Sequence, residues 1–282
     1  MGGVGGDWAR YWRAGRRPLE AMYAHFERHV YHRHSHDTYS FGVTETGAQS
    51  FTCRGAAHTS AAGMVMAFNP DDPHDGHAAD ALGFTYRIVH IGPGLVTEAL
   101  ADATGRRGPL PLFAAPLVAD AAAAGALRAF HRALLDPAAT ALRRDELLAS
   151  TVARLVRAAA TQAPPDPPKA RGTSAATAAR ARGFLEDHLL DDPTAEELAR
   201  ATGGSRFAVY RAFVARYGMP PSDYQRLLRL RRARTLIADG VPIGEAAAAT
   251  GFTDQSHLTR WFVRCFGLTP GAYREAGRSP RN

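Results

Sequence analysis

Two stretches of the chain share one pattern and decide the fold: Arg211–Tyr224 reads RAFVARYGMPPSDY, and Arg260–Tyr273 reads RWFVRCFGLTPGAY. With a shift of 49 positions, an arginine, a phenylalanine, a valine, an aromatic residue, a glycine, a proline and a tyrosine fall on their counterparts. Upstream the register slips by one position, and Glu197–Gly203 then matches Glu245–Gly251 in its glutamate and its Thr-Gly pair. We interpret the two stretches as copies of one supersecondary unit.

Each copy predicts a short helix, a tight turn and a second helix, at about residues 194–217 and 243–266. The short helix of each copy ends at a glycine, Gly203 or Gly251, which suits the left-handed conformation that closes a helix. A short helix, a glycine turn and a second helix form the helix-turn-helix pattern, which is typical of DNA-binding proteins.

The second helix of each copy has the residues of a recognition helix. Ser205 is expected to cap the helix Arg206–Tyr217, and Asp254 is expected to cap the helix Gln255–Phe266. One face of each helix is apolar and should pack inward, so that the other face can enter a DNA groove. The candidate DNA-binding residues on these helices are Arg206, Phe207, Tyr210, Arg211, Gln255, Ser256, His257, Arg260 and Arg264. Arginine can bind guanine or phosphate with two bonds, and glutamine can bind adenine.

The segment Ser222–Ala238 between the copies predicts a linker helix with one apolar and one basic face. Its length corresponds to roughly 25 Å of helix. A rigid linker of that size could hold two recognition helices about one DNA turn apart, roughly 34 Å. The basic face, expected to contact phosphates, consists of Arg226, Arg229, Arg231, Arg232 and Arg234.

The distribution of charge supports an anionic partner for this part of the chain. The formal net charge is +7, and nearly all of the excess lies after residue 170, whereas ten of the twelve histidines lie before it. This asymmetry indicates a basic, nucleic-acid-binding half joined to a half with another task.

Composition excludes several other classes of protein. No stretch reaches 18 consecutive apolar residues, so no transmembrane helix is expected, and residues 1–17 lack the apolar run of a signal peptide. The two cysteines, Cys53 and Cys265, are too few for a disulfide framework or a cysteine-rich zinc module. A reducing cytoplasm is the expected location.

A proline-rich segment, QAPPDPPKARGT at residues 162–173, predicts an extended linker between two domains. We therefore expect an α+β protein of two domains. The first, residues 1–161, would be a sensing and dimerisation domain. The second, residues 174–282, would be all-helical and carry both helix-turn-helix units.

The first domain has the pattern of a β-sandwich or barrel. Short segments rich in β-branched and aromatic residues alternate with Gly, Pro, Asn and Asp turns between residues 18 and 92. The expected strands are Tyr39–Glu45, which Gly47 would end, Ser50–Arg54, Met64–Phe68 and Phe84–Ile91.

Three trailing helices are expected after the barrel, at 95–101, 120–135 and 141–160, because apolar residues recur there at helical spacing. The stripes on the last two helices could pack against the barrel or form a homodimer interface. The sequence leaves both open.

The histidines of the first domain allow two interpretations. His34 and His36 precede an expected strand, and His74 and His77 are expected in a loop about 40 residues further along. Residues i and i+2 of an extended segment point the same way, so His34, His36 and His74 could share a metal ion. We prefer buried, hydrogen-bonded histidines at the mouth of the barrel, with no metal and no cofactor.

The stretch from about Arg180 to Arg274 closely resembles the DNA-binding domain of AraC/XylS-type transcription regulators. The motifs that carry this resemblance are Leu198-Ala199, Tyr217–Pro221, Leu228-Arg229-Leu230 with Ala233, and above all Gly251–Leu258 with Trp261-Phe262. The resemblance implies seven helices with two helix-turn-helix units. Bulky Phe207 and Tyr210, after the loose turn Gly203-Gly204, would read DNA shape and methyl groups more than hydrogen-bond patterns.

The earlier half is similar to the cupin-like sensing domain of the same family, in His34-x-His36-Asp37-x-Tyr39 and in Asn69-Pro70-x2-Pro73-His74. This similarity implies a barrel that binds a small effector. The candidate effector-binding residues are His34, His36, Tyr39, His74 and Tyr86.

The favoured function is a sequence-specific transcription regulator, not an enzyme, with double-stranded DNA and a small effector as partners. RNA polymerase and a second copy of the chain are further candidate partners, and activation and repression both remain open. The alternative is a cupin-type metal-dependent enzyme with a DNA-binding tail. A DNA-repair methyltransferase would need an activated acceptor cysteine, and neither cysteine of this chain has an activating context. The long polar side chains on the two recognition helices argue against an architectural protein that binds DNA without sequence preference.

Overall fold

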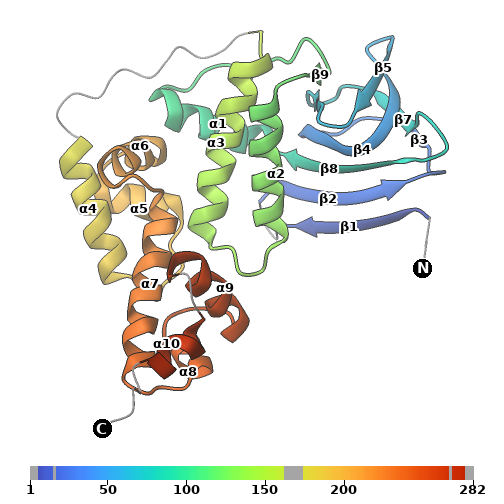
Figure 1. Cartoon of the computed structure of the whole chain (residues 1–282). Helices are drawn as coiled ribbons and strands as arrows, with labels where there is room; N and C mark the ends of the chain where they lie inside the picture. The colour runs from blue at the N-terminus through green and yellow to red at the C-terminus, as the bar shows by residue number, and fades with distance from the viewer. Residues whose placement is uncertain (1–5, 15–16, 162–173, 267–268, 277–282) are drawn as a thin grey trace. The chain divides into compact units, whose positions relative to one another are not determined.

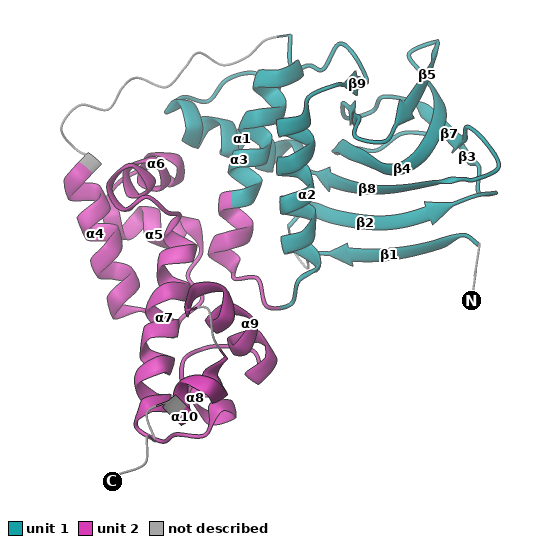
Figure 2. Cartoon of the chain, in the orientation of Figure 1, with its two compact units in different colours: residues 1–137, 147–169 teal, residues 138–146, 170–282 magenta. Residues whose placement is uncertain are grey.

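The chain folds into two compact units (Figures 1 and 2). The computed structural model describes residues 6–14, 17–161, 174–266 and 269–276. Unit 1 comprises residues 1–137 and 147–169, and unit 2 comprises residues 138–146 and 170–282. The expected proline-rich linker, residues 162–173, lies outside the described residues. Residues 138–146, which the sequence assigned to the first domain, group with unit 2.

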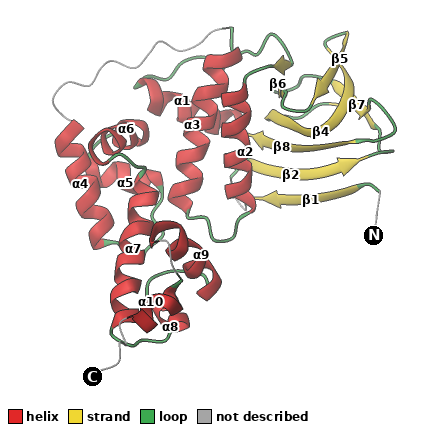
Figure 3. Ribbon diagram, in the orientation of Figure 1, coloured by secondary structure: helices red, strands yellow, loops and turns green. Residues whose placement is uncertain are grey.

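Unit 1 is rich in antiparallel β-structure (Figure 3). Its strands are β1 (Trp8–Arg13), β2 (Leu19–Phe26), β3 (Tyr31–His34), β4 (Tyr39–Cys53), β5 (Ala56–Ala61), β6 (Val65–Phe68), β7 (His74–Ala78), β8 (Phe84–Ile91) and β9 (Leu117–Val118). One sheet has the order β1-β2-β8-β4-β6-β9. The long strand β4 leaves this sheet and pairs with β5 and β7, and β7 pairs with β3, so the strands wrap into the expected cupin-like barrel.

Successive side chains along a strand of the main sheet point to opposite faces, so the sheet contributes to two different cores. On β4, Tyr39, Phe41 and Val43 join a core that also contains the helices. On β8, the even-numbered residues Phe84, Tyr86 and Ile88 join a second core inside the barrel, whereas Val89 and Ile91 join the helical one.

The strand boundaries differ from the sequence prediction at two places. Gly47 does not end a strand: β4 continues through it with a positive φ of 70° and a register shift between Thr44 and Thr46. A side chain at Gly47 would meet the carbonyl oxygen of Gly83, 2.1 Å from the Cβ position, so the pairing of β4 with the start of β8 requires glycine here. His74 begins β7, where a loop was expected.

Three helices follow the barrel, as predicted: α1 (Pro93–Thr104), α2 (Ala121–Leu135) and α3 (Ala141–Ala159). In unit 1, α1, α2 and the later part of α3 bury their apolar stripes in the same core as one face of the main sheet. On α2 these buried residues include Leu127, Phe130 and Leu134. The stripes are therefore used within one chain, and dimerisation through them stays a prediction.

Unit 2 is all-helical, as expected, and contains both helix-turn-helix units. Its helices are α4 (Ser174–Asp187), α5 (Ala195–Thr202), α6 (Arg206–Tyr217), α7 (Pro221–Ala238), α8 (Ile243–Ala249), α9 (Gln255–Phe266) and α10 (Pro270–Ala276). The first helix-turn-helix unit has its own core around Leu198 and Phe213, and the second helix-turn-helix unit has a core around Leu258 and Phe262. Helix α7 contributes Tyr224 to the first core and Leu230, Ala233 and Ile237 to the second.

One buried arginine of α7 bonds to the segment before the first helix-turn-helix unit and to the turn of the second. The guanidinium of Arg229 donates to the carbonyl oxygens of Leu189 (2.8 Å) and Asp191 (2.6 Å), which precede the first unit, and of Gly251 (3.3 Å), in the turn of the second. Arg229 is only 7% exposed. The expectation that it lies on an exposed basic face is wrong, because three backbone oxygens hold it inside the fold.

Residues 138–146 supply part of the first helix-turn-helix unit. Leu142 is buried in the core of that unit. The carboxylate of Asp145 accepts a hydrogen bond from the backbone N–H of Ala195 at the start of α5 (3.2 Å). Glu146 accepts bonds from the backbone N–H and the hydroxyl of Ser222, in the first turn of α7. Two consecutive acidic residues therefore satisfy N–H groups that open two different helices.

Replacing Arg229 by alanine should destabilise unit 2. Three carbonyl oxygens would lose a buried donor, so we expect a loss of about 3 kcal/mol in the free energy of unfolding. The exposed neighbour Arg231 is the control, and R231A should change stability by less than about 0.5 kcal/mol. Urea unfolding followed by the fluorescence of Trp261, in a background with Trp8 and Trp12 replaced by Phe, reports on unit 2. Equal stability of R229A and R231A would contradict the role given to Arg229.

The stability of unit 2 should also fall with rising pH because of Glu146. Burial raises the pKa of Glu146 from 4.5 to about 7, while bonds from Ser222 and the nearby Arg143 oppose the shift and Asp223 adds to it. Between these pH values the folded state binds a proton that the unfolded state has lost, so the free energy of unfolding decreases as pH rises through this window, by an amount on the order of 3 kcal/mol.

The isosteric E146Q variant should remove this pH dependence. The same fluorescence-detected unfolding, repeated from pH 5 to pH 8, should give a nearly flat stability curve for E146Q and a falling one for the parent chain. Parallel curves would show that Glu146 does not titrate in this range.

Candidate functional site

The first recognition helix, α6, has the ends that the sequence predicts. The Ser205 hydroxyl accepts a hydrogen bond from the N–H of Ala208, and Gly203 and Gly218 adopt left-handed conformations before and after the helix. Val209 and Phe213 are buried. The predicted reading face is less open than expected, since Arg206, Phe207, Tyr210 and Arg211 are all half-buried.

The half-buried residues of α6 have partners within unit 2. The side chain of Arg206 is 18% exposed and lies 3.9 Å from the carboxylate of Glu196 on α5. The guanidinium of Arg211 stacks over the ring of Phe207, 5.1 Å from its centre. The predicted readers Arg206 and Arg211 therefore both have contacts within unit 2.

The second recognition helix, α9, exposes most of its predicted readers. Gln255, Ser256, Arg260 and Arg264 are exposed, and Asp254 caps the helix through the N–H of His257 (2.7 Å).

The fifth predicted reader on α9, His257, is placed differently. It is 9% exposed, accepts a hydrogen bond from the indole N–H of Trp261 (3.0 Å) and packs edge-on against Phe252. The expectation that His257 faces outward is wrong. The imidazole ring of His257 is buried, where Trp261, one turn further along the helix, donates to it.

Exposed cations of α7 extend the basic surface. Arg231, Arg232 and Arg234 are exposed, as the sequence predicts for phosphate contacts. Arg226 instead pairs with Asp223 (2.7 Å) and stacks over the ring of Trp261, 3.9 Å from its centre. That stacking joins the linker helix to the second recognition helix.

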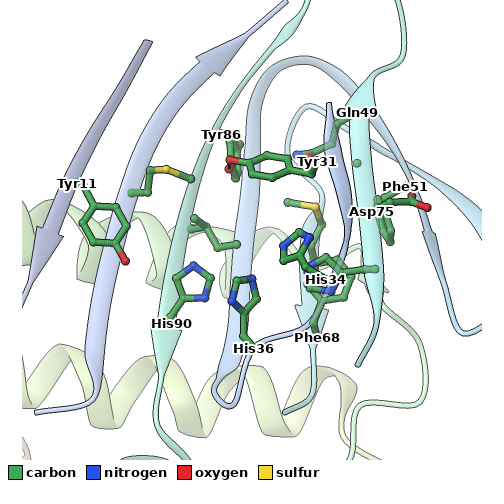
Figure 4. Close-up of a pocket in the computed structure, with 15 residues that line it drawn as sticks. Tyr11, Tyr31, His34, His36, Gln49, Phe51, Phe68, Asp75, Tyr86 and His90 are labelled. Atoms are coloured by element: carbon green, nitrogen blue, oxygen red, sulfur yellow. Dashed lines mark hydrogen bonds between the residues drawn. The ribbon is translucent and has the colours of Figure 1, made fainter. Parts of the chain in front are cut away.

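Unit 1 contains a cavity of about 250 Å³ inside the barrel (Figure 4). Of the five predicted effector-binding residues, His34, His36, His74 and Tyr86 line it. Tyr39 does not: it lies on the helical face of β4, and its hydroxyl donates to the carbonyl oxygen of Pro111 (2.8 Å).

Sequence reasoning missed several residues of the cavity. Tyr31 was missed: its hydroxyl lies 2.9 Å from that of the predicted residue Tyr86, and burial raises the pKa of both tyrosines. His90 on β8 was missed as well. The alternation of β8 contains the signal, because His90 has the same parity as Tyr86 and Ile88 and so faces the barrel interior.

Four histidine rings gather at one end of the cavity, where Figure 4 shows His90, His36 and His34 side by side. The ring centres are 4.5 Å apart for His36 and His90, 4.9 Å for His34 and His36, and 4.5 Å for His34 and His74. His74 also stacks flat on Phe68 at 4.1 Å, which fixes the plane of its ring.

Hydrogen bonds orient three of the four rings. The Nδ1 atoms of His34 and His74 lie 2.6 Å and 2.8 Å from the carbonyl oxygens of His32 and Asp72. Because a carbonyl oxygen only accepts, each Nδ1 carries the proton and each Nε2 presents a lone pair in the neutral ring. The Nδ1 of His90 bonds to the hydroxyl of Ser40 (2.8 Å).

Burial also keeps three of these rings neutral. It lowers the pKa of His74 to about 4 and that of His90 to about 3, and it lowers the pKa of His36 with help from the neighbouring His34. Neutral imidazole is the form that binds metal ions.

The donor set of this cluster fits a metal ion. One ligand nitrogen from each of His34, His36 and His74 lies within 4.8 Å of the others. Bonds of about 2.1 Å bring two nitrogens on one ion to within roughly 3–4 Å, so small side-chain rotations suffice. Metal-binding histidines commonly donate their other ring N–H to a carbonyl oxygen, as Nδ1 of His34 and of His74 does here. The geometry is thus compatible with the metal ion that the sequence offers as an alternative at His34, His36 and His74, and the choice between the two interpretations stays a prediction.

Two family models match the two units. Residues 18–156 match the model of an AraC-like ligand binding domain, and residues 198–276 match a helix-turn-helix domain. A barrel with a ligand-sized cavity, followed by twin helix-turn-helix units, defines the class as a DNA-binding transcription regulator with a ligand-binding domain. The chain belongs to the AraC family of such regulators, as the sequence resemblance implies.

Similar proteins include other transcription regulators. An uncharacterized HTH-type transcriptional regulator of Bacillus subtilis, YbfI, is 30% identical over 232 residues, which cover 80% of each chain. The transcriptional activator NphR of Rhodococcus is 31% identical over 153 residues, 54% of this chain and 40% of NphR. A solved AraC-type regulator from Chromobacterium violaceum is 27% identical over 37% of this chain and 95% of that one, with a TM-score of 0.35.

None of the helices in the described ranges has the length and apolar character that crossing a bilayer requires.

Proposed function

We propose that this regulator reads double-stranded DNA mainly through α9 and positions itself through α6 and α7. The observation that carries the proposal is the exposure of Gln255, Ser256, Arg260 and Arg264 on the recognition helix of a capped helix-turn-helix unit. Arginine and glutamine supply the two-bond contacts that distinguish guanine and adenine in the major groove.

The linker helix sets the spacing of the two readers. Helix α7 has 18 residues, about 27 Å of helix. Its ends lie in the cores of the two helix-turn-helix units, and Arg229 bonds to the segment before the first unit and to the turn of the second. A rigid spacing of this size is compatible with two successive major grooves, roughly 34 Å apart. The exposed Arg231, Arg232 and Arg234 would contact the phosphates between them.

The first recognition helix has a different role in this proposal. Arg206, Phe207, Tyr210 and Arg211 remain its candidate contacts, but their partial burial leaves less side chain to reach base edges. Stacking of Arg211 on Phe207 presents a flat, cationic surface that suits phosphates and thymine methyl groups. We expect α6 to set affinity and α9 to set sequence preference.

The effector would bind in the cavity of unit 1, against His34, His36, His74 and Tyr86. An effector that prefers one conformer of the chain shifts the population that binds DNA. A homodimer, a contact with RNA polymerase and a cytoplasmic location belong to the same proposal. The role is regulatory, as in the relatives, and no catalytic step is assigned to the chain.

The Arg260→Ala variant tests the reading surface. If Arg260 contacts a base, the variant should lose about 1–3 kcal/mol of specific binding and relax preference at one position of the site, and R211A should weaken binding to all sequences alike. Genome-wide mapping of bound DNA supplies the site, and gel-shift titrations of both variants on that site and on scrambled DNA give the two effects.

An arginine of unit 1 controls for charge. Arg132 is exposed on α2, and R132A removes the same charge from the chain. Its binding curve should overlay that of the parent chain. If R260A binds specific and scrambled DNA as the parent does, α9 is not the reading helix.

A further inference from the structure

The four histidines at the end of the cavity come from three separate parts of the chain. His34 ends β3 and His36 follows it, His74 begins β7, and His90 lies on β8. The barrel brings them together from positions up to 56 residues apart in the sequence. Their side chains are half-buried or buried, in walls that include Phe68, Met66 and Ile88.

We propose that this cluster binds one divalent first-row transition-metal ion through His34, His36 and His74, with His90 as a fourth imidazole ligand, and that the ion anchors an anionic effector. The second part rests on the proposed function, which places an effector in this cavity. The two parts are tested by different measurements.

The orientation of the rings calls for a cation. His34 and His74 each use Nδ1–H for a backbone carbonyl, so their Nε2 lone pairs are the atoms left to face the other rings. Lone pairs directed at one another repel, and an ion bound between them removes the repulsion. The ring of His90 is held by the hydrogen bond between its Nδ1 and the hydroxyl of Ser40 (2.8 Å).

The ligand type selects the ion. The converging ligand atoms are imidazole nitrogens, which suit Zn²⁺, Cu²⁺, Fe²⁺ and Ni²⁺, whereas Mg²⁺ and Ca²⁺ prefer oxygen. The carboxylate among the residues that line the cavity, Asp75, accepts the backbone N–H of Thr52 (2.6 Å), so that bond already holds it. Neutral imidazoles would leave the ion with its full double charge.

The double positive charge of the bound ion favours an anionic effector. The cavity continues from the histidines between aromatic and aliphatic walls, with the Tyr31–Tyr86 hydroxyl pair further in (Figure 4). In such low-dielectric surroundings an uncompensated double charge is costly, so an anionic oxygen on the ion is strongly favoured. A volume of about 250 Å³ is small for a drug-sized ligand. The effector class is therefore a small organic acid with an apolar or aromatic body.

Cobalt titration of the full chain tests the metal site. After removal of metal with a chelator, Co²⁺ should bind one ion per chain and give the visible absorption bands of a nitrogen-coordinated ion. H36Q and H74Q should each weaken Co²⁺ binding by at least about 100-fold. His77 lies exposed on the same strand as His74, so H77Q is the matched control and should bind as the parent does.

Two outcomes of this titration overturn the metal site. Absence of stoichiometric Co²⁺ from the parent chain overturns it outright, and so does equal weakening by H74Q and H77Q. H90Q should shift the Co²⁺ bands and weaken binding by about 10-fold. An unchanged spectrum and affinity for H90Q would remove His90 from the ligand set.

A pair of probe molecules tests the effector class. Benzoate should shift the bands of the Co²⁺-loaded chain, whereas benzamide, of the same shape without the charge, should leave them unchanged. Equal responses to the two probes, or no response to either, would overturn the anionic effector.

The mapped DNA site separates this inference from the proposed function. Intact DNA binding without Co²⁺ binding overturns the metal site alone. Co²⁺ binding in a chain whose R260A variant reads DNA normally overturns the reading surface alone.

Discussion

The DNA-binding unit depends on one buried guanidinium. Arg229 lies near the middle of α7 and donates to carbonyl oxygens of the segment that leads into the first helix-turn-helix unit and of the turn in the second. Apolar packing alone would leave two small cores joined by one helix, free to twist about it. The guanidinium of Arg229 satisfies all three carbonyl groups in only one position. It therefore fixes the angle between the two helix-turn-helix units as well as their distance. Gly251 supplies one of these carbonyls and has a positive φ of 75°, with a Cβ position 3.2 Å from the guanidinium carbon.

A second constraint acts at the N-terminal end of α7. Asp145 and Glu146 bond to the first turns of α5 and α7, although they precede the proline-rich segment in the sequence. The remainder of α3, from Leu147 onward, belongs to the unit that holds the histidine cavity. One continuous helix therefore takes part in both units. Within unit 2, the recognition helices and the linker helix are thus held by short, specific polar contacts as well as by apolar cores.

Local signals in the sequence predicted the helices well and the side-chain environments less well. Caps, glycine stops and the repeat located α5 to α9 to within a residue or two, because each depends on neighbours in the chain. The burial of Arg229 and His257 depends on partners outside their own turn, namely distant carbonyl groups and Trp261. In the barrel, strand parity alone separates Tyr39 from the cavity and places His90 in it. The close approach of Gly83 to Gly47, where β4 pairs with β8, joins residues far apart in the sequence, so no local pattern reveals it.

We propose that α7 and Arg229 hold two recognition helices at a fixed spacing on one DNA duplex. Hydroxyl-radical footprinting of the full chain on its mapped site tests this spacing directly. We expect two protected segments on one face of the duplex, about one helical turn apart, with the segment under α9 showing the stronger sequence preference. A single protected segment, or two segments whose spacing varies from site to site, would contradict it.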